Sequence, residues 1–300
     1  MNISIVGCGG WADYTHMPCI LKYGKVNIIS CADINIKNAK NFHEKYNIPL
    51  YFSDYNEMLD KTNPDAVICL VSPDAIAKAA SDIVRRCPVM LEKPPGNTVE
   101  ETNMLFEAAK KSGKAHMVAF NRRFVPAYLN LKETIAENKD EIKYINYKFH
   151  RIKRHDSDFE HTAIHAVDAV KFLAGDNFKR IEIKYQEMPQ LGENVANYFV
   201  FFEFANGIFA TAEILVSTGE LSEGCEIHTG SGENIYRASI PMGKIATNEE
   251  HYISQGFYNE HKHFYECLAS GKNPGNGADT AVQSVAVCNA LKNRENLIIF

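Results

Sequence analysis

The stretch Met1-Asn2-Ile3-Ser4-Ile5-Val6-Gly7-Cys8-Gly9-Gly10-Trp11-Ala12 decides the fold class of this chain. Its first residues, 2–6, are an apolar run that predicts a buried strand, and a helical pattern follows the glycines. In this G-x-G-x-x-A arrangement, Gly7 permits a tight turn, Gly9 lets a phosphate approach the backbone, and Ala12 allows helix and strand to pack closely. The N-terminus of such a helix attracts phosphate. The stretch therefore predicts a strand–loop–helix unit that binds a dinucleotide.

An acidic residue completes this pattern. Asp33 ends the second predicted strand, residues 26–32, and lies 21 residues after Ala12. A carboxylate at this place hydrogen-bonds the ribose hydroxyls of NAD, and its charge disfavours the 2′-phosphate of NADP. No arginine follows it closely, so we expect NAD to be preferred, while Lys37 leaves NADP possible.

Composition excludes several classes of partner. The net charge is −5, and no basic block marks a nucleic-acid binder. The longest apolar runs have the length of strands and are too short to cross a membrane. Eight cysteines are scattered without a C-x-x-C pair, and the first residues do not resemble a signal peptide. We expect a cytoplasmic protein that binds a small-molecule substrate, with neither a nucleic-acid nor a membrane partner.

Residues 1–119 alternate predicted strands with predicted helices. Such alternation, with strands that are apolar on both faces, predicts a parallel sheet covered by helices on both sides. We interpret this part as an α/β Rossmann domain that binds NAD(P). The strands are expected at 2–6, 26–32, 66–71, 88–91 and 115–119, and the intervening helices at 35–46, 75–86 and 99–112.

Residues 120–300 have a different pattern. Apolar and polar residues alternate over 143–150, which predicts a strand. Strand-like runs predict further strands at 180–187, 196–204, 208–216, 226–229, 234–239 and 297–300. Helices are expected at 126–138, 162–173, 257–270 and 279–292. Asn206-Gly207 predicts a type I′ hairpin. We predict an α+β domain for substrate binding and oligomerisation, with a large, mostly antiparallel open sheet. Whether the two late helices pack back on the first domain is left open.

Three further motifs resemble those of one family. They are Glu92-Lys93-Pro94, Asn121-Arg122-Arg123-Phe124 and Ile164-His165-Ala166-Val167-Asp168, in that order along the chain. With the glycine loop, they resemble the Gfo/Idh/MocA family of NAD(P)-dependent oxidoreductases. The stretch from His150 to Asp168 is similar to the MviM-type ("virulence factor") branch in particular.

The resemblance implies an enzyme that transfers hydride between a nicotinamide and a small polar alcohol or carbonyl compound, such as a sugar, a polyol or a derivative. It implies Lys93 as the acid–base group, with His165 as second choice. The cofactor contacts it implies are Gly7, Gly9, Gly10, Trp11, Ala12, Asp33, Ser72, Pro73, Glu92, Lys93 and Asn121. Substrate contacts are expected from Arg122, Arg123, His161 and Asp168.

The chain also departs from the family pattern. Ser72-Pro73-Asp74 replaces the usual Thr-Pro-Asn, and His161 stands where many family dehydrogenases have aspartate. These departures leave room for a non-catalytic NAD-binding regulator on the same fold. A glycosidase that uses bound NAD for transient oxidation is a further alternative.

Several charged side chains allow two interpretations. Arg122 and Arg123, with Arg151 and Arg154, could bind an anionic group of the substrate, or could pair with surface acids. His161 and His165 lie one helical turn apart, which permits metal chelation, although hydride transfer needs no metal and we predict none. We expect His43, His251, His261 and His263 to be ordinary surface residues.

The run Tyr198-Phe199-Val200-Phe201-Phe202 is apolar at successive positions, so both faces of its strand are expected to be covered. A sheet with helices on one side would leave the other face for a second subunit. We therefore expect a homodimer or a homotetramer.

Overall fold

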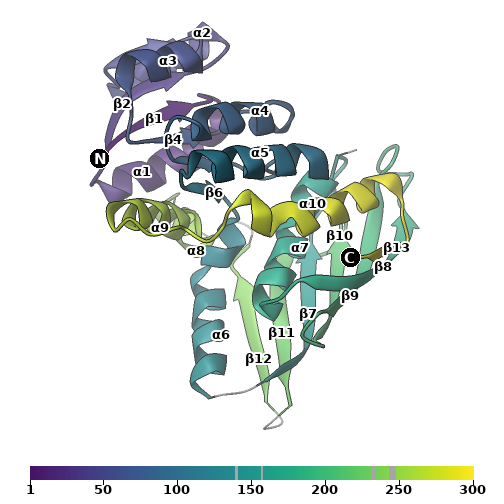
Figure 1. The fold of residues 1–300 in the computed structure, drawn as a ribbon. Helices are drawn as coiled ribbons and strands as arrows, with labels where there is room; N and C mark the ends of the chain where they lie inside the picture. The colour runs from purple at the N-terminus through teal and green to yellow at the C-terminus, as the bar shows by residue number, and fades with distance from the viewer. Residues whose placement is uncertain (139–140, 157, 231–233, 243–247) are drawn as a thin grey trace. The chain divides into compact units, whose positions relative to one another are not determined.

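The computed structural model describes residues 1–138, 141–156, 158–230, 234–242 and 248–300. The chain divides into two compact units, Met1–Phe120 with Phe257–Val282, and Asn121–Gly256 with Gln283–Phe300. Each unit contains one β-sheet (Figure 1). None of the helices in the described ranges has the length and the apolar character that crossing a bilayer requires.

The first unit is built on a six-stranded parallel sheet of order β3-β2-β1-β4-β5-β6. Starting from β1, the chain adds strands on one side and then on the other, so a topological switch point lies between β1 and β4. Ligands of open parallel sheets bind at such points, beyond the carboxyl ends of the strands. The strands are β1 (Asn2–Val6), β2 (Asn27–Ala32), β3 (Leu50–Phe52), β4 (Ala66–Cys69), β5 (Val89–Leu91) and β6 (His116–Val118).

The helices of this unit begin with a π-helical turn, η1 (Ala12–His16), which continues as α1 (Met17–Tyr23). Helix α1 packs against α9 (Phe257–Ala269), which comes from the far end of the chain. The remaining helices are α2 (Ile36–Tyr46), α3 (Tyr55–Thr62), α4 (Pro73–Val84), α5 (Val99–Ser112) and the first turn of α10 (Ala278–Asn293). Strand β3 and helix α3 did not emerge from the sequence pattern, because β3 has only three residues and two of them are exposed.

The second unit contains a seven-stranded sheet of order β12-β11-β7-β10-β9-β8-β13. Every neighbouring pair is antiparallel except β7 and β10, which confirms the predicted mostly antiparallel sheet. Its strands are β7 (Ile142–His150), β8 (Phe178–Glu187), β9 (Ala196–Phe204), β10 (Phe209–Leu215), β11 (Ser222–Thr229), β12 (Ile235–Ile240) and β13 (Leu297–Ile299). Its helices are η2 (Asn121–Phe124), α6 (Pro126–Glu137), α7 (Glu160–Ala174), α8 (Asn248–Ser254) and the rest of α10.

Helix α7 crosses one face of this sheet and packs on β7 and β10 (Figure 1). Burial alternates along β9 from Tyr198 to Phe204. In β9, Tyr198, Val200 and Phe202 are buried in the core, whereas Phe201 between them is half exposed on the other face. The sheet therefore has one covered face and one open face.

The β9–β10 hairpin differs from the predicted type I′ turn. A type I′ turn needs positive φ at both central residues, but of the two only Gly207 has it, at 84°. The Gly207 N–H donates to Phe204 O (3.1 Å) and the Phe204 N–H donates to Ile208 O (2.9 Å), which defines a three-residue loop. Asn206 explains the difference. Its side chain donates to Ala174 O (3.1 Å) and accepts from Ile208 N (3.2 Å).

Candidate functional site

The glycine loop after β1 has the backbone that the motif requires. Gly7 has φ of 94°, and a Cβ there would lie 2.5 Å from the carbonyl oxygen of Leu70. Gly7 N donates to Ala32 O (2.8 Å), which closes the loop against β2. A Cβ at Gly9 would meet nothing within 4 Å, so the space above this residue is open. Ala12 is buried, as its packing role demands.

Asp33 follows β2 and faces the same loop. Its Oδ2 accepts a hydrogen bond from Cys8 N (2.8 Å), and its Oδ1 accepts one from Asn35 N (2.8 Å). Oδ1 also accepts a long bond from Asn38 Nδ2 (3.5 Å), and Oδ2 has a second lone pair that can accept a further bond. The carboxylate is thus oriented by backbone donors and still able to bind hydroxyl groups.

A cavity of about 680 Å³ opens beyond the carboxyl ends of β1, β2 and β4. Four of the predicted cofactor residues line it, namely Gly7, Gly9, Asp33 and Ser72. Ile34 also lines it, and its apolar side chain is 97% exposed. A smaller neighbouring cavity of about 240 Å³ includes Gly10. The size and position of the large cavity suit a nucleotide.

Glu92 and Lys93 follow β5 in the same unit. The Glu92 side chain is largely buried, and its Oε1 accepts bonds from Trp11 Nε1 (2.8 Å) and from His16 Nε2 (2.9 Å). Its Oε2 accepts a bond from the backbone N–H of Lys93 (3.1 Å). Burial alone would raise the pKa of the Glu92 carboxyl. The hydrogen bond and the charge of His16, with help from Lys93 and Trp11, lower that pKa below its ordinary value.

The expectation that His261 is a surface residue was wrong. It is fully buried on α9, where its Nε2 lies 2.8 Å from His16 Nδ1 and its Nδ1 lies 3.1 Å from the Tyr265 hydroxyl. Burial, with the proximity of His16, lowers the pKa of His261 well below its ordinary value. Sequence reasoning also missed His16, because a histidine in a helix beside the glycine loop has no feature that marks a buried partner.

In the second unit, Arg122 belongs to a buried ion cluster. Its Nε and Nη2 donate to the two carboxylate oxygens of Glu223 (2.8 and 2.9 Å), and Arg151 Nη2 donates to the same carboxylate (2.6 Å). The Tyr147 hydroxyl donates the fourth bond (2.8 Å). Burial opposes the charge of Glu223, but the guanidinium of Arg122, and then that of Arg151, outweigh it and lower the pKa to about 2.

Arg123 forms a second buried pair, in which its Nε and Nη2 donate to the Asp168 carboxylate (2.8 and 2.6 Å). The side chain of Asn121 donates to Gln255 O (2.8 Å). Arg122, Arg123 and Asp168 therefore have internal partners of their own, which are buried rather than the surface acids considered above. Their assignment to substrate binding stays a prediction.

His161 and His165 lie on α7, and both are partly exposed. The Nδ1 of His161 is 3.6 Å from an oxygen of Asp158, one turn earlier. Within the described residues, no cluster of three or more His, Cys, Asp or Glu side chains is arranged to hold a metal ion. Lys93 belongs to the first unit and His165 to the second, and their catalytic roles stay predictions.

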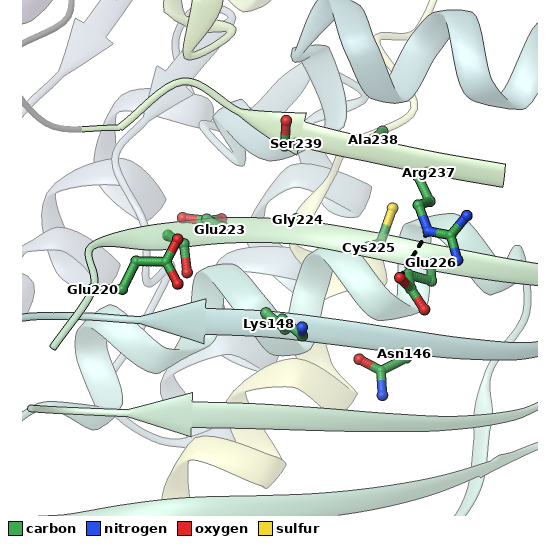
Figure 2. A pocket seen from close by; sticks show the side chains of 11 residues that line it. Asn146, Lys148, Glu220, Glu223, Gly224, Cys225, Glu226, Arg237, Ala238 and Ser239 are labelled. Atoms are coloured by element: carbon green, nitrogen blue, oxygen red, sulfur yellow. Dashed lines mark hydrogen bonds and ion pairs between the residues drawn. The ribbon is translucent and has the colours of Figure 1, made fainter. Parts of the chain in front are cut away.

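A further cavity, of about 360 Å³, opens on β7, β11 and β12 in the second unit (Figure 2). Glu226 and Arg237 form an ion pair across it (2.8 Å), and Lys148 and Asn146 lie along its floor on β7. None of the residues that carry the family motifs lines this cavity. We therefore place the candidate cofactor site in the first unit.

The first 120 residues are similar to one family of known proteins. Residues 1–120 match the model described as an oxidoreductase family with an NAD-binding Rossmann fold, Gfo/Idh/MocA. Over these residues the chain resembles the Gfo/Idh/MocA family. The chain is 25% identical to the scyllo-inositol 2-dehydrogenase (NAD(+)) of Bacillus subtilis, over 91% of this chain and 88% of that protein. It is 26% identical to the D-glucoside 3-dehydrogenase of Escherichia coli, over 45% of this chain and 39% of the relative.

The matches to the first three curated relatives cover 39%, 62% and 60% of the length of those proteins. Among solved structures, the chain resembles scyllo-inositol dehydrogenase from Lactobacillus casei, whose crystals contained NAD(H) and scyllo-inositol. The TM-score is 0.84 at 14% identity, over 100% of this chain and 98% of the other. At this identity the likeness establishes a shared fold.

Proposed function

We propose that this chain is an NAD(P)-dependent oxidoreductase that transfers hydride between a nicotinamide cofactor and a small polar alcohol or carbonyl compound, in the class of sugars, polyols and their derivatives. One observation supports this most directly. The glycine loop and Asp33 line a single cavity at the switch point of a parallel sheet, and the Glu92-Lys93-Pro94 segment follows β5 of that sheet. Relatives named as polyol and glucoside dehydrogenases support the same class of substrate.

The residues present fit a dinucleotide. The open space at Gly9 and the start of the helix at Gly10 suit a pyrophosphate, because backbone N–H groups at a helix N-terminus attract anions. Asp33 suits the ribose hydroxyls, and the exposed side chain of Ile34 suits the flat apolar face of an adenine. The carboxylate also disfavours an additional phosphate, so we propose that NAD binds more tightly than NADP.

When bound, the cofactor supplies or accepts the hydride at its nicotinamide ring. The chain itself must move the proton of the substrate hydroxyl, and we assign this step to the Nζ of Lys93. In the oxidation of an alcohol, Lys93 takes the hydroxyl proton as the hydride leaves the carbon. In the reduction of a carbonyl compound, it returns that proton to the oxygen. The Glu92 carboxylate accepts the Lys93 N–H and thereby fixes the backbone from which this side chain extends.

Two measurements test the proposal. Calorimetric titration with NAD and NADP should give tighter binding of NAD, and equal or tighter NADP binding would refute the argument from Asp33. A screen of polyols, sugars, sugar acids and diols, read by NADH absorbance, should identify substrates. If no compound is turned over despite tight NAD binding, and a pull-down recovers a protein partner, the protein is a regulator and the enzymatic proposal fails.

We further propose that the open face of the second unit's sheet binds a second copy of the chain. Exposed apolar side chains of β9, β10 and β13 are interleaved with polar ones on these strands and on β8. Leu297 is aligned through Glu182 with Phe201, and Ile299 is aligned through Arg180 and Glu203 with Phe209. Phe201 is 50% exposed and Ile299 is 73% exposed, although their strands belong to the core sheet. Light scattering should therefore give a mass of at least two chains at micromolar concentration, and a mass of one chain would contradict the proposal.

We propose the cytoplasm as the compartment of the protein. All eight cysteines are free thiols with buried side chains. Free thiols are usual in the reducing cytosol, whereas disulfides are the rule in secreted proteins. Localisation of the tagged protein by cell fractionation tests this, and recovery from the periplasmic or culture fraction would contradict it.

A further inference from the structure

Four buried side chains of the first unit form a continuous hydrogen-bonded chain. Glu92 Oε1 lies 2.9 Å from His16 Nε2, His16 Nδ1 lies 2.8 Å from His261 Nε2, and His261 Nδ1 lies 3.1 Å from the Tyr265 hydroxyl. Three segments that are distant in sequence supply these groups, namely the π-helical turn η1, the end of β5 and helix α9. The residue that follows Glu92 is the proposed acid–base group, Lys93. One end of this hydrogen-bonded series, Glu92, is therefore the sequence neighbour of Lys93.

The direction of the hydrogen bonds at Glu92 is determined by chemistry. An ionised carboxylate only accepts hydrogen bonds, and the Trp11 indole and the Lys93 backbone N–H only donate them. The remaining contact, at 2.9 Å, therefore requires a proton on His16 Nε2. Glu92 then accepts three bonds, from Trp11 Nε1, His16 Nε2 and the Lys93 backbone.

The direction at the other nitrogen of His16 depends on its protonation state, and His261 can serve both states. When His16 is neutral, its Nδ1 accepts from His261 Nε2–H, and the Tyr265 hydroxyl donates to His261 Nδ1. When His16 carries a second proton, the bonds between His16 and His261 and between His261 and Tyr265 reverse direction. His16 Nδ1–H then donates to His261 Nε2, and His261 Nδ1–H donates to the Tyr265 hydroxyl. In both states His16 Nε2–H donates to Glu92, and no member of the chain loses a partner.

The surroundings isolate this chain from water. His16, His261 and Tyr265 are all fully buried, and the ring of Phe257 packs edge-on against that of His16. The titratable groups that face the chain are Lys93 at the Glu92 end and, from α1, Cys19 and Tyr23 near Tyr265; Glu260 of α9 faces Cys19. In such a place an unpaired carboxylate would be strongly disfavoured.

We propose that His16 is a positioning residue for Lys93, acting through Glu92, and that His261 and Tyr265 hold the imidazole of His16 in the tautomer that this role requires. Without the His16 donor, burial would raise the pKa of the Glu92 carboxyl, and the protonated side chain would rotate away from Trp11 or from the Lys93 backbone. The inference rests on the acid–base role of Lys93 in the function proposed above.

Nuclear magnetic resonance of the cofactor-free protein tests the chain independently of activity. Long-range ¹H–¹⁵N spectra should show a proton on His16 Nε2, and ¹³C titration of Glu92 should give a pKa below its ordinary value. In His16→Leu that pKa should rise above the ordinary value, whereas His16→Gln should keep it low, because the glutamine amide places a donor near the position of Nε2. An unchanged Glu92 titration in His16→Leu would overturn the proposal.

A second variant serves if His16→Leu does not fold. His261→Leu removes the partner of His16 Nδ1, and we expect the ¹⁵N spectra of His16 to change from one tautomer to a mixture. His261→Gln should keep the single tautomer, because its amide can donate to His16. A single, unchanged tautomer in His261→Leu would refute the role assigned to His261.

Kinetics separate positioning from a merely structural role. Loss of an outer hydrogen-bond partner costs about 10- to 100-fold at metal sites, and we expect a fall of that order in kcat for His16→Leu with KM little changed. In His16→Leu the pKa of Glu92 should be raised, so Glu92 becomes protonated at a higher pH than in the wild type. The activity of this variant should therefore be lost as the pH falls through the raised pKa. A lower Tm with an unchanged pH profile would overturn the proposal.

His263→Gln is the matched control. His263 lies on α9, as His261 does, but it bonds to Pro274 O and does not belong to the hydrogen-bonded series. Its pH profile should equal that of the wild type, and a shift equal to that of His16→Leu would overturn the inference. The two proposals also fail in different ways. Lack of turnover on every substrate would refute the enzymatic function, whereas an unchanged Glu92 titration would refute the positioning role even in an active enzyme.

Discussion

Replacing Glu223 by glutamine should reveal how strongly the buried ion cluster stabilises the second unit. Glu223→Gln keeps the size of the side chain but removes the charge that Arg122 and Arg151 share. One carboxylate oxygen becomes an NH₂ group, which cannot accept from a guanidinium. Two buried positive charges would then face each other without an anion, and their side chains are only 8% exposed.

Two routes give the expected magnitude. Removing one partner of a buried ion pair costs about 3–5 kcal/mol, because the remaining charge is uncompensated. The pKa of Glu223, lowered from 4.5 to about 2, corresponds to about 3 kcal/mol in favour of the ionised form. The routes agree, and we expect a loss of about 3 kcal/mol at pH 7. For a domain of this size, this lowers Tm by roughly 10 °C.

The pH dependence has a definite sign. The pKa of Glu223 is lower in the folded than in the unfolded chain, so its contribution is fully present above the ordinary value of 4.5. It is lost as the pH falls from there toward about 2. The difference in unfolding free energy between wild type and Glu223→Gln should therefore be constant from pH 7 to pH 5 and shrink below that.

Urea unfolding followed by circular dichroism measures this difference at each pH. Glu226→Gln is the matched control on the same strand, because the Glu226–Arg237 pair is exposed and such pairs contribute little. We expect no measurable change for the control. A loss below about 1 kcal/mol in Glu223→Gln, or a loss equal to that of the control, would refute the reasoning from the buried cluster.

Lys93→Ala should lower kcat by about 10²–10⁴-fold and leave NAD affinity nearly unchanged, since the phosphates and the ribose are held elsewhere; full kcat would show that Lys93 is not the acid–base group. Gly7→Ala should abolish NAD binding in calorimetry, because the added Cβ would lie 2.5 Å from Leu70 O. Gly113→Ala is the control for backbone conformation alone, because Gly113 has φ of 67° and open space around it. Normal NAD affinity in Gly7→Ala would contradict the role of the loop. His161→Asp should raise turnover of polyols if the histidine merely replaces the family's aspartate, and reduced native activity would instead show that His161 has its own role.

Much of the first unit could be predicted because its signals are local. Helix 99–112 was predicted with the bounds that α5 has, and its Thr98 cap and Gly113 end are both present. Strand β3 and helix α3 were missed, although Asp54 caps α3 in the structure. Three residues at the edge of a sheet are too few to show the period of a strand. The capping residue Asp54 was the local signal in the sequence for α3.

In the second unit the strands were found and the details of the turn were not. The strand-like run Ala196–Phe204 predicted β9 with its observed bounds. The Asn206-Gly207 dipeptide indicated the hairpin correctly but not its type. The Ala174 carbonyl that accepts the bond from Asn206 lies at the end of α7, and a contact between such distant residues cannot be predicted from a local pattern.

The sequence by itself determined the glycine loop, the acid at Asp33, most of the strands and helices, and the resemblance to one family. These depend on spacing along the chain, which the backbone converts directly into geometry. Only the tertiary structure decided the partners of the charged and titratable groups. Glu223 meets Arg122 across 101 residues, and His16 meets His261 across 245. A buried charge must be paired, but any of the 37 acidic residues could satisfy an arginine, and packing alone selects which one does.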